Sequence, residues 1–168
     1  LYTTERSAHL NLMREGVAEE RVHFVGNVMI DSLLSNREHA HPAAQVLLMA
    51  GVAPEVLDEP CGYGVVTLHR PSNVDRLDRL EPLLSVLREV SERIPLVFAL
   101  HPRTRANIER FALLDLLASD RIVLLPPQGY LEMLGLLTRA RLVLSDSGGL
   151  QEETTALGVP CLTMRENT

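Results

Sequence analysis

The sequence contains no lysine, and all 16 of its cationic side chains are arginines. Without lysine the chain can form no Schiff base with a carbonyl substrate, and it cannot supply the phosphate-binding lysine of a Walker motif. It also lacks an uninterrupted apolar run of about 18 residues, the length that a membrane-spanning helix needs. These absences exclude two kinds of active site and a membrane span of this type.

Charge and cysteine content narrow the possible partners. The 22 acidic side chains outnumber the 16 arginines, which gives a net charge of -6 and a pI near 5.5. No overall positive field is available to hold a nucleic acid, so we expect no nucleic-acid partner. Cys61 and Cys161 are far apart in the sequence and outside any metal-ligand spacing, which predicts reduced thiols in the cytosol, no disulfide and no metal site.

The length of 168 residues is that of one ordinary domain with one core. Apolar residues make up 46% and charged residues 23%, which is a globular balance. The chain opens at Leu1 without an initiator methionine or a secretory leader, and it stops directly after an apolar strand. We therefore expect it to be a piece of a longer polypeptide.

Apolar runs of strand length alternate with helical apolar periods along most of the chain. Continuous apolar runs such as Val65-Val66 and Leu142-Val143-Leu144 are typical of strands covered on both faces. They predict an α/β fold, a doubly wound parallel sheet of the Rossmann-like kind between two helix layers. The predicted strands are 21–25, 64–68, 96–100, 122–125, 142–144 and 161–164, and the predicted helices run from a cap at Thr3 or Thr4 to Glu15, around 30–34, and over 43–49, 77–93, 104–117, 130–137 and 150–157.

Ligands of open α/β sheets bind beyond the carboxyl ends of the strands, where the strand order reverses. We number the strands from Gly64 onward one to five and assume the order 3-2-1, with strand four on the other side of strand one. The loops after strands one and four then adjoin. They are segments 69–73 and 145–149, the most polar of the chain, so the site is predicted where they meet.

Ser147, Gly148 and Gly149 lie between a buried strand and a helix. The glycines let a ligand approach the backbone, the serine adds a hydroxyl, and the free amides of the helix start attract anions. This pattern predicts a diphosphate site, with Glu153 one turn on to accept hydrogen bonds from ribose hydroxyls. The same residues also fit a plain strand-to-helix link, in which Glu152 and Glu153 only favour the helix dipole.

Two histidine–arginine pairs each follow a buried strand: His69 with Arg70, and His101 with Arg103. An arginine fork beside a histidine suits a phosphate or a leaving group that gains charge, although a lone histidine is more often structural. Asn73 can fix the first loop by bonding its own backbone. Both pairs are predicted on one edge of the sheet, which favours a binding role.

Other segments give weaker signals. Tyr130 and Met133, one turn apart in a predicted helix, could frame a slot for a base, but Met133 fits a core position equally well. The Gly-Tyr-Gly segment at 62–64 precedes its strand and lacks the third glycine of a dinucleotide fingerprint, which disfavours NAD. Neither a His-Glu-x-x-His zinc helix nor a Gly-x-Ser-x-Gly elbow occurs. Surface or linker positions are predicted for His9, His23, His39 and His41.

Several motifs together make the chain similar to a known family. They are Val25-Gly26-Asn27 with Ile30-Asp31, Thr67-Leu68-His69-Arg70 with Asn73, His101-Pro102-Arg103, Ser-Asp-Ser-Gly-Gly-Leu-Gln-Glu-Glu at 145–153, Leu-Gly-Val-Pro at 157–160, and Arg165-Glu166-Asn167-Thr168. With this combination, over its whole length, the sequence resembles the non-hydrolysing UDP-N-acetylglucosamine 2-epimerases.

The resemblance implies a glycosyltransferase-B-like enzyme of two Rossmann-like domains, with its active site in the cleft between them. Residues 1–168 match the second, UDP-binding domain as a single domain, and the N-terminal domain with the acid and base carboxylates is absent from this chain. The family interconverts UDP-N-acetylglucosamine and UDP-N-acetylmannosamine without a metal, nicotinamide or other cofactor. It removes the proton at C2, expels UDP to leave a 2-acetamidoglucal, and adds UDP back.

The resemblance also implies a role for each matching residue. Ser147, Gly148 and Gly149 hold the diphosphate. Glu153 binds the ribose, and the helix at Met133 borders the uracil. The catalytic residue is His69, which steadies the departing UDP where charge develops. The other expected substrate-binding residues are Arg70, Asn73, His101 and Arg103.

Two departures from the family pattern matter. Pro71-Ser72 replaces an Arg-Glu pair common in bacterial members. The binding role of the loop is still expected, but regulation by substrate is not. Met133 stands where an aromatic residue is frequent, so stacking on uracil is expected to be weaker there.

Alone, the chain is expected to bind UDP-N-acetylglucosamine without turnover. The full-length enzyme is expected to be a cytoplasmic homodimer that supplies N-acetylmannosamine units for surface polysaccharide, with no nucleic-acid or membrane partner. Two alternatives stay open: a UDP-sugar-dependent glycosyltransferase of the same architecture, and a non-catalytic nucleotide-sugar-binding domain.

Overall fold

The computed structural model describes residues 1–165, so the last three residues of the Arg-Glu-Asn-Thr motif lie outside the described residues. The chain forms two compact units, Leu1–Glu38 and His39–Thr168. Among residues 1–165, no helix is both long and apolar enough to cross a membrane. Both polar loops of the predicted site belong to the second unit.

The first unit is a small β-α-β arrangement. Strands β1 (Tyr2–Thr3) and β2 (His23–Phe24) pair in parallel, with Tyr2 opposite His23, and α1 (Arg6–Arg14) connects them. Helix α2 (Val28–Asn36) follows. The strand predicted over 21–25 is therefore present but shorter.

The caps of the two helices differ. The predicted cap of α1 at Thr3 or Thr4 is wrong, because Thr3 lies in β1 and the helix begins later, with Glu5 in the cap position. Asn27 caps α2 with its side chain, since its Oδ1 accepts the amide hydrogen of Met29 at 3.0 Å.

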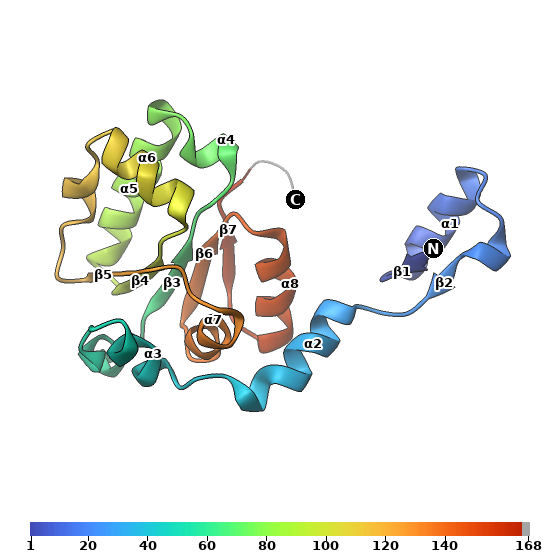
Figure 1. The fold of residues 1–168 in the computed structure, drawn as a ribbon, viewed down its shortest axis with the longest axis horizontal. Coiled ribbons are helices and arrows are strands. Elements are labelled where there is room, and N and C mark those ends of the chain that lie inside the picture. The colour runs from blue at the N-terminus through green and yellow to red at the C-terminus, as the bar shows by residue number, and fades with distance from the viewer. Residues whose placement is uncertain (166–168) are drawn as a thin grey trace. The chain divides into compact units, whose positions relative to one another are not determined.

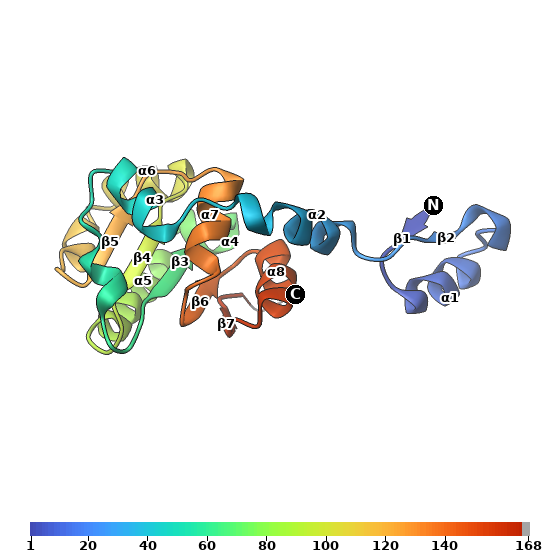
Figure 2. The same cartoon turned by 90° about the horizontal axis from the view of Figure 1, so that it is seen from below.

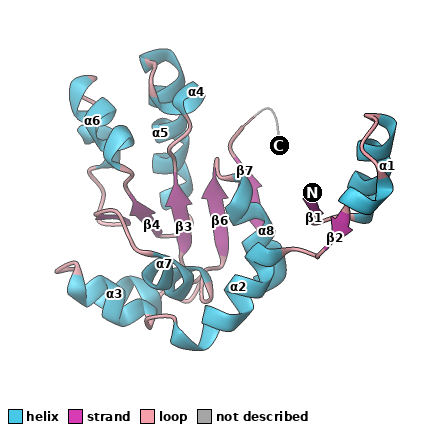
Figure 3. Ribbon diagram, turned by 45° about the vertical axis from the view of Figure 1, so that its right-hand side comes forward, coloured by secondary structure: helices cyan, strands magenta, loops and turns pink. Residues whose placement is uncertain are grey.

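The second unit is built on a parallel sheet with the strand order β5-β4-β3-β6-β7. This order confirms the prediction that the strands after Gly64 run 3-2-1 with strand four on the other side of strand one. The arrowheads of β3 and β6 point to the same end of the sheet (Figure 3). The strands of this sheet are β3 (Gly64–Thr67), β4 (Leu96–Ala99), β5 (Ile122–Leu125), β6 (Leu142–Ser145) and β7 (Cys161–Thr163).

Helices cover both faces of the sheet, as predicted for a doubly wound fold (Figure 1). Neighbouring residues of one strand enter different cores: Val66 packs with Leu84 on the α5 and α6 side, and Val65 packs with Leu136 on the side of α3, α7 and α8. The helices of this unit are α3 (Ala43–Met49), α4 (Pro71–Val74), α5 (Leu77–Ser91), α6 (Pro102–Arg110), α7 (Tyr130–Leu137) and α8 (Gly148–Leu157).

Some element boundaries differ from the prediction. The helix expected over 104–117 stops at Arg110, because Ala112 takes a left-handed backbone with φ of 55°, and a separate 3₁₀ turn covers Leu114–Leu117. The short helix α4 was not predicted. It begins at Pro71, whose fixed φ suits the first position of a helix.

A close contact joins α7 to the chain before α3, and both views show α3 beside α7 (Figures 1 and 2). The amide of His41 donates to the carbonyl of Leu131 at 3.2 Å. Gly135 faces this segment, and a Cβ on it would lie 1.7 Å from the His41 carbonyl oxygen. The hydroxyl of Tyr63 donates to the carbonyl of Leu136 at 2.7 Å, and burial raises the pKa of this tyrosine to about 12.

Candidate functional site

The loops after β3 and β6 meet at the carboxyl edge of the sheet, as the sequence predicted. Thr67 and Ser145, the last residues of the two strands, are register partners, and their hydroxyl oxygens are 2.7 Å apart. Asp146, the next residue, accepts the amide hydrogens of His69 at 3.1 Å and Arg70 at 2.8 Å. One buried carboxylate therefore holds the first loop against the second.

Asp146 also binds side chains of the first loop. Its Oδ1 lies 2.8 Å from Nδ1 of His69, and its Oδ2 accepts from Nδ2 of Asn73 at 3.1 Å. Asn73 donates in addition to the carbonyl of Met164 at 2.7 Å, which fastens the end of β7 to the same cluster. Sequence reasoning did not single out Asp146, although an acid directly after a buried strand and before Ser-Gly-Gly was the signal available.

The start of α8 keeps the features of an anion site. Ser147 is the cap residue, and its Oγ accepts the amide hydrogen of Leu150 at 3.4 Å. Its hydroxyl hydrogen can still be donated to a ligand. The amides of Gly148 and Gly149 belong to the first turn, where backbone N–H groups have no partner within the helix.

Arg165 covers this helix start, although sequence reasoning did not include it among the site residues. A Cβ on Gly148 would lie 3.4 Å from Nη2 of Arg165, so the guanidinium lies over the glycine. Its Nε is buried and has no hydrogen-bond partner among the described residues. Nε of Arg70 donates to the carbonyl of Asp146 at 3.2 Å. Two guanidinium groups and a helix N-terminus thus come together, which is an arrangement suited to phosphate.

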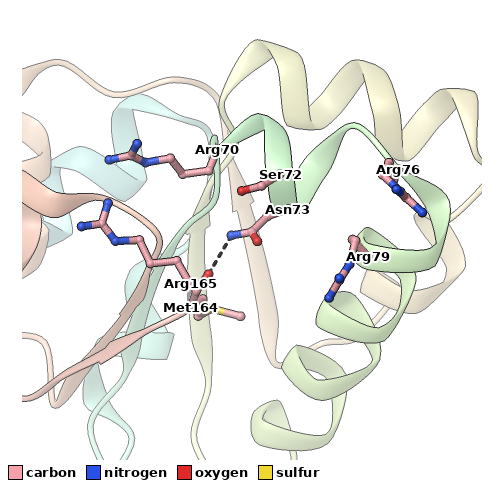
Figure 4. A pocket seen from close by; sticks show the side chains of 7 residues that line it. All are labelled: Arg70, Ser72, Asn73, Arg76, Arg79, Met164 and Arg165. Carbon is pink, nitrogen blue, oxygen red and sulfur yellow. Dashed lines mark hydrogen bonds between the residues drawn. The ribbon is translucent and has the colours of Figure 1, made fainter. Parts of the chain in front are cut away.

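A cavity of about 630 Å³ opens beside this cluster (Figure 4). In Figure 4 the Arg70 and Arg165 side chains extend in the same direction, away from Arg79. Arg76 is paired with Asp78 at 2.8 Å. The described residues that line the cavity are Arg70, Ser72, Asn73, Arg76, Arg79, Met164 and Arg165.

Glu153 and Tyr130 meet between α8 and α7. The carboxylate of Glu153 accepts a hydrogen bond from Tyr130, and the residue is 9% exposed. Burial raises the pKa of Glu153, and burial together with the nearby carboxylate raises the pKa of Tyr130. Met133, on the same helix as Tyr130, is half-buried and packs against the core below α7. The position of Met133 is compatible with both expectations, that it is a core residue and that it borders a slot for a base.

The second histidine–arginine pair has separate surroundings. The His101 ring lies 5.9 Å from the His69 ring, centroid to centroid, and its Nδ1 accepts the amide hydrogen of Arg103 at 3.2 Å. The guanidinium of Arg103 holds Asp75 through two hydrogen bonds, at 2.6 and 2.5 Å, and this lowers the pKa of that carboxyl. The fold thus brings His101 to His69 and ties Arg103 to α4.

The cysteines and the possible metal-binding side chains are not gathered in one cluster in the part of the chain that the structure describes. Residues 1–165 contain no group of three or more histidine, cysteine, aspartate or glutamate side chains that could hold a metal ion. Cys61 is exposed and Cys161 half-buried at the start of β7, and both are free thiols.

Comparison with protein families gives one match over the entire chain. The family model described as UDP-N-acetylglucosamine 2-epimerase matches residues 1–168. A UDP-N-acetylglucosamine 2-epimerase of Methanocaldococcus jannaschii is 39% identical, and the match covers 100% of this chain and 46% of the relative. A UDP-2,3-diacetamido-2,3-dideoxy-D-glucuronate 2-epimerase of Pseudomonas aeruginosa is 38% identical, with 100% of this chain and 44% of the relative covered.

Solved structures give the same result. The crystal structure of M. jannaschii UDP-GlcNAc 2-epimerase in complex with UDP-GlcNAc and UDP matches with a TM-score of 0.83 and 37% identity, covering 100% of this chain and 46% of that one. The UDP-GlcNAc 2-epimerase from Neisseria meningitidis bound to UDP-GlcNAc matches with a TM-score of 0.72 and 27% identity, covering 99% and 44%. The chain therefore spans about half the length of the relatives that it matches.

Proposed function

Because this chain belongs to the UDP-N-acetylglucosamine 2-epimerase family, we propose that it is the UDP-binding half of an enzyme that interconverts UDP-N-acetylglucosamine and UDP-N-acetylmannosamine. The reaction removes the C2 proton, expels UDP to leave a 2-acetamidoglucal, and then adds UDP back at C1 while a proton returns to the opposite face of C2. The observation that carries the proposal is the meeting of His69 with the helix start at Ser147.

The diphosphate is held at the start of α8. The amides of Gly148 and Gly149 and the hydroxyl of Ser147 donate to its oxygens, and Arg165 lies over the same turn. The buried Nε of Arg165 without a partner among the described residues supports this role, because a buried donor is costly unless a ligand satisfies it.

The nucleoside extends from the diphosphate toward α7. Glu153 accepts hydrogen bonds from the ribose hydroxyls, and Met133 borders the uracil. The closeness of Glu153 to Tyr130 supports this path, since it shows that α8 and α7 approach each other along it.

His69 acts on the departing UDP. Negative charge develops on the leaving diphosphate, and a donor held in place before the bond breaks stabilises that charge without reorganisation. Arg70, Asn73, His101 and Arg103 complete the proposed substrate-binding set at this edge of the sheet.

The acid and base carboxylates are proposed to lie in an N-terminal domain outside this chain. The parallel pair β1 and β2 supports a further domain, because two strands alone are too few for a stable sheet and Tyr2 and Phe24 are exposed. The complete enzyme is proposed to act as a homodimer in the cytoplasm, supplying N-acetylmannosamine units for surface polysaccharide.

The direct test uses the full-length polypeptide. Incubated with UDP-N-acetylglucosamine in D₂O, it should produce UDP-N-acetylmannosamine with deuterium at C2, detected by NMR, whereas the 168-residue chain alone should bind UDP and give no product. Failure of the complete polypeptide to form this product would refute the proposal. A labelled sugar transferred to an added acceptor would favour a glycosyltransferase instead.

A second candidate substrate is a UDP-sugar that carries a carboxylate. It is favoured by the relative from P. aeruginosa, named for a diacetamido-glucuronate, and by the arginines that line the cavity, because guanidinium groups bind carboxylates well. Comparing kcat/KM for the two UDP-sugars on the full-length polypeptide decides between them.

A further inference from the structure

We propose that Asp146 is a positioning residue, which fixes the proton of His69 on Nδ1 and directs Nε2 to the ligand. The catalytic consequence rests on the proposed function above. The protonation pattern itself follows from the contacts of the loop and holds whatever the ligand is.

The groups around Asp146 make its carboxylate an acceptor of hydrogen bonds. Its carboxylate is fully buried, at 0% exposure, and every group that bonds it is a donor or can be one. The backbone N–H groups of His69 and Arg70 can only donate, and Asn73 faces Asp146 with Nδ2, the donor that also binds the Met164 carbonyl at 2.7 Å. Both carboxylate oxygens are therefore engaged as acceptors, and they can only accept from Nδ1 of His69, 2.8 Å away.

The consequence for His69 is a fixed orientation. With Nδ1 donating to Asp146, the ring can no longer rotate to offer that nitrogen elsewhere, and Nε2 becomes the atom that can act on a ligand. The side chain is 39% exposed, so a ligand can reach it.

A diphosphate at Nε2 would complete the arrangement. Phosphate oxygens only accept hydrogen bonds, and so does the Asp146 carboxylate. The His69 ring between them can donate to both when it is an imidazolium, because each ring nitrogen then carries a proton. In this state His69 gives a charge-assisted hydrogen bond to the leaving UDP and transfers no proton. Asp146 favours that state because it lies against the opposite nitrogen.

The same carboxylate also has a structural role, which the experiment must separate. Through Asn73 it holds the carbonyl of Met164, next to Arg165, and through the amide of Arg70 it holds the loop after β3. Loss of Asp146 could weaken UDP binding by loosening these segments without any effect on the His69 proton.

The first measurement reads the proton directly in the wild-type chain. Long-range ¹H–¹⁵N NMR of ¹⁵N-labelled protein, above about pH 8 where free histidine is neutral, should show His69 protonated on Nδ1, with the signal assigned by its absence in H69Q. Addition of UDP should place protons on both nitrogens. A ring protonated on Nε2 in the free protein would overturn the proposal.

The second measurement uses Asp146→Asn, which keeps the shape but turns one oxygen into a donor. The His69 ring should then move toward the Nε2-protonated form, whereas Asp115→Asn, the same change at an exposed position, should leave it unaltered. Unchanged tautomers in a folded D146N protein would contradict the proposal, and the wild-type spectrum remains decisive if D146N does not fold.

A double-mutant cycle tests whether Asp146 acts through His69. D146N and H69Q should each weaken UDP binding by about tenfold, and the double variant should be no more than about twofold weaker than H69Q. Multiplicative losses, near a hundredfold, would show a structural role alone. These readouts need no turnover, so a full-length polypeptide that fails to epimerise would refute the proposed function and leave this inference standing.

Discussion

Glu153 is buried, and it is proposed to bind the ribose hydroxyls of the ligand. Its carboxylate is 9% exposed and accepts a hydrogen bond from Tyr130, and burial raises its pKa. Glu153→Gln keeps an oxygen for Tyr130 but removes the charge. We expect it to weaken UDP binding by about tenfold, since hydrogen bonds to a charged group contribute about 1.5 to 3 kcal/mol. Isothermal titration calorimetry measures this, with Glu152→Gln as the exposed neighbouring control.

The same substitution should change the pH dependence of stability. A carboxyl whose pKa is raised by folding binds more protons in the folded state, so its contribution is present at low pH and is lost as the pH rises. Above about pH 4.3, the usual glutamate value, wild type should therefore lose free energy of unfolding relative to E153Q. Urea denaturation at pH 4 and pH 7 checks this: the free energy of unfolding of wild type minus that of E153Q should be lower at pH 7 than at pH 4, and an increase in this difference would contradict the prediction.

A substitution at Gly148 should weaken UDP binding without changing the stability of the fold. A Cβ at this position would lie 3.4 Å from Nη2 of Arg165, an ordinary contact, so Gly148→Ala should change the free energy of unfolding by no more than about 0.5 kcal/mol. The methyl group would nevertheless occupy space where the diphosphate meets the backbone. We expect UDP affinity to fall at least about tenfold, whereas Thr155→Ala, exposed on the same helix, should bind UDP normally.

At the scale of elements, the packing of α7 depends on one residue without a side chain. A Cβ on Gly135 would lie 1.7 Å from the His41 carbonyl oxygen, a backbone atom that cannot move independently. Gly135→Ala should therefore destabilise the protein by about 1 to 3 kcal/mol, as overpacking does. Chemical denaturation measures the loss.

The matched control for this helix is Gly129→Ala. The close neighbour of its Cβ is Oε2 of Glu132, the end of a flexible side chain that can turn away. G129A should keep nearly wild-type stability. Equal losses in the two variants would show that the backbone contact at His41 is not what limits position 135.

At the scale of the whole molecule, a ligand that binds the folded second unit must stabilise it. UDP at about a hundred times its Kd should raise the free energy of unfolding by about 2.7 kcal/mol, which corresponds to about 5 to 11 °C in Tm for a chain of this size. NAD at the same concentration should give no shift. A shift with NAD and none with UDP, measured by differential scanning fluorimetry, would contradict the assigned nucleotide.

The sequence alone was sufficient for the layered α/β architecture, whereas the strand order was an assumption that the structure then confirmed. Apolar periodicity is a local property, so it predicted Ala43–Met49, Ile122–Leu125 and Tyr130–Leu137 with the bounds that the structure has. Cap and break positions were less predictable. Glu5 occupies the cap position without a side-chain cap bond, and Ala112 has a positive φ although it is not glycine, so the residue types at these positions signalled neither feature.

The candidate site likewise has a part that the sequence predicted and a part that only the structure showed. The loops at His69 and Ser147 could be predicted to meet, because carboxyl ends of adjacent parallel strands share one edge. The role of Asp146, the cover of Gly148 by Arg165, and the pairing of Arg103 with Asp75 depended on the tertiary structure. Each joins segments that are distant in the chain, and the burial and direction of a side chain exist only once those segments have packed.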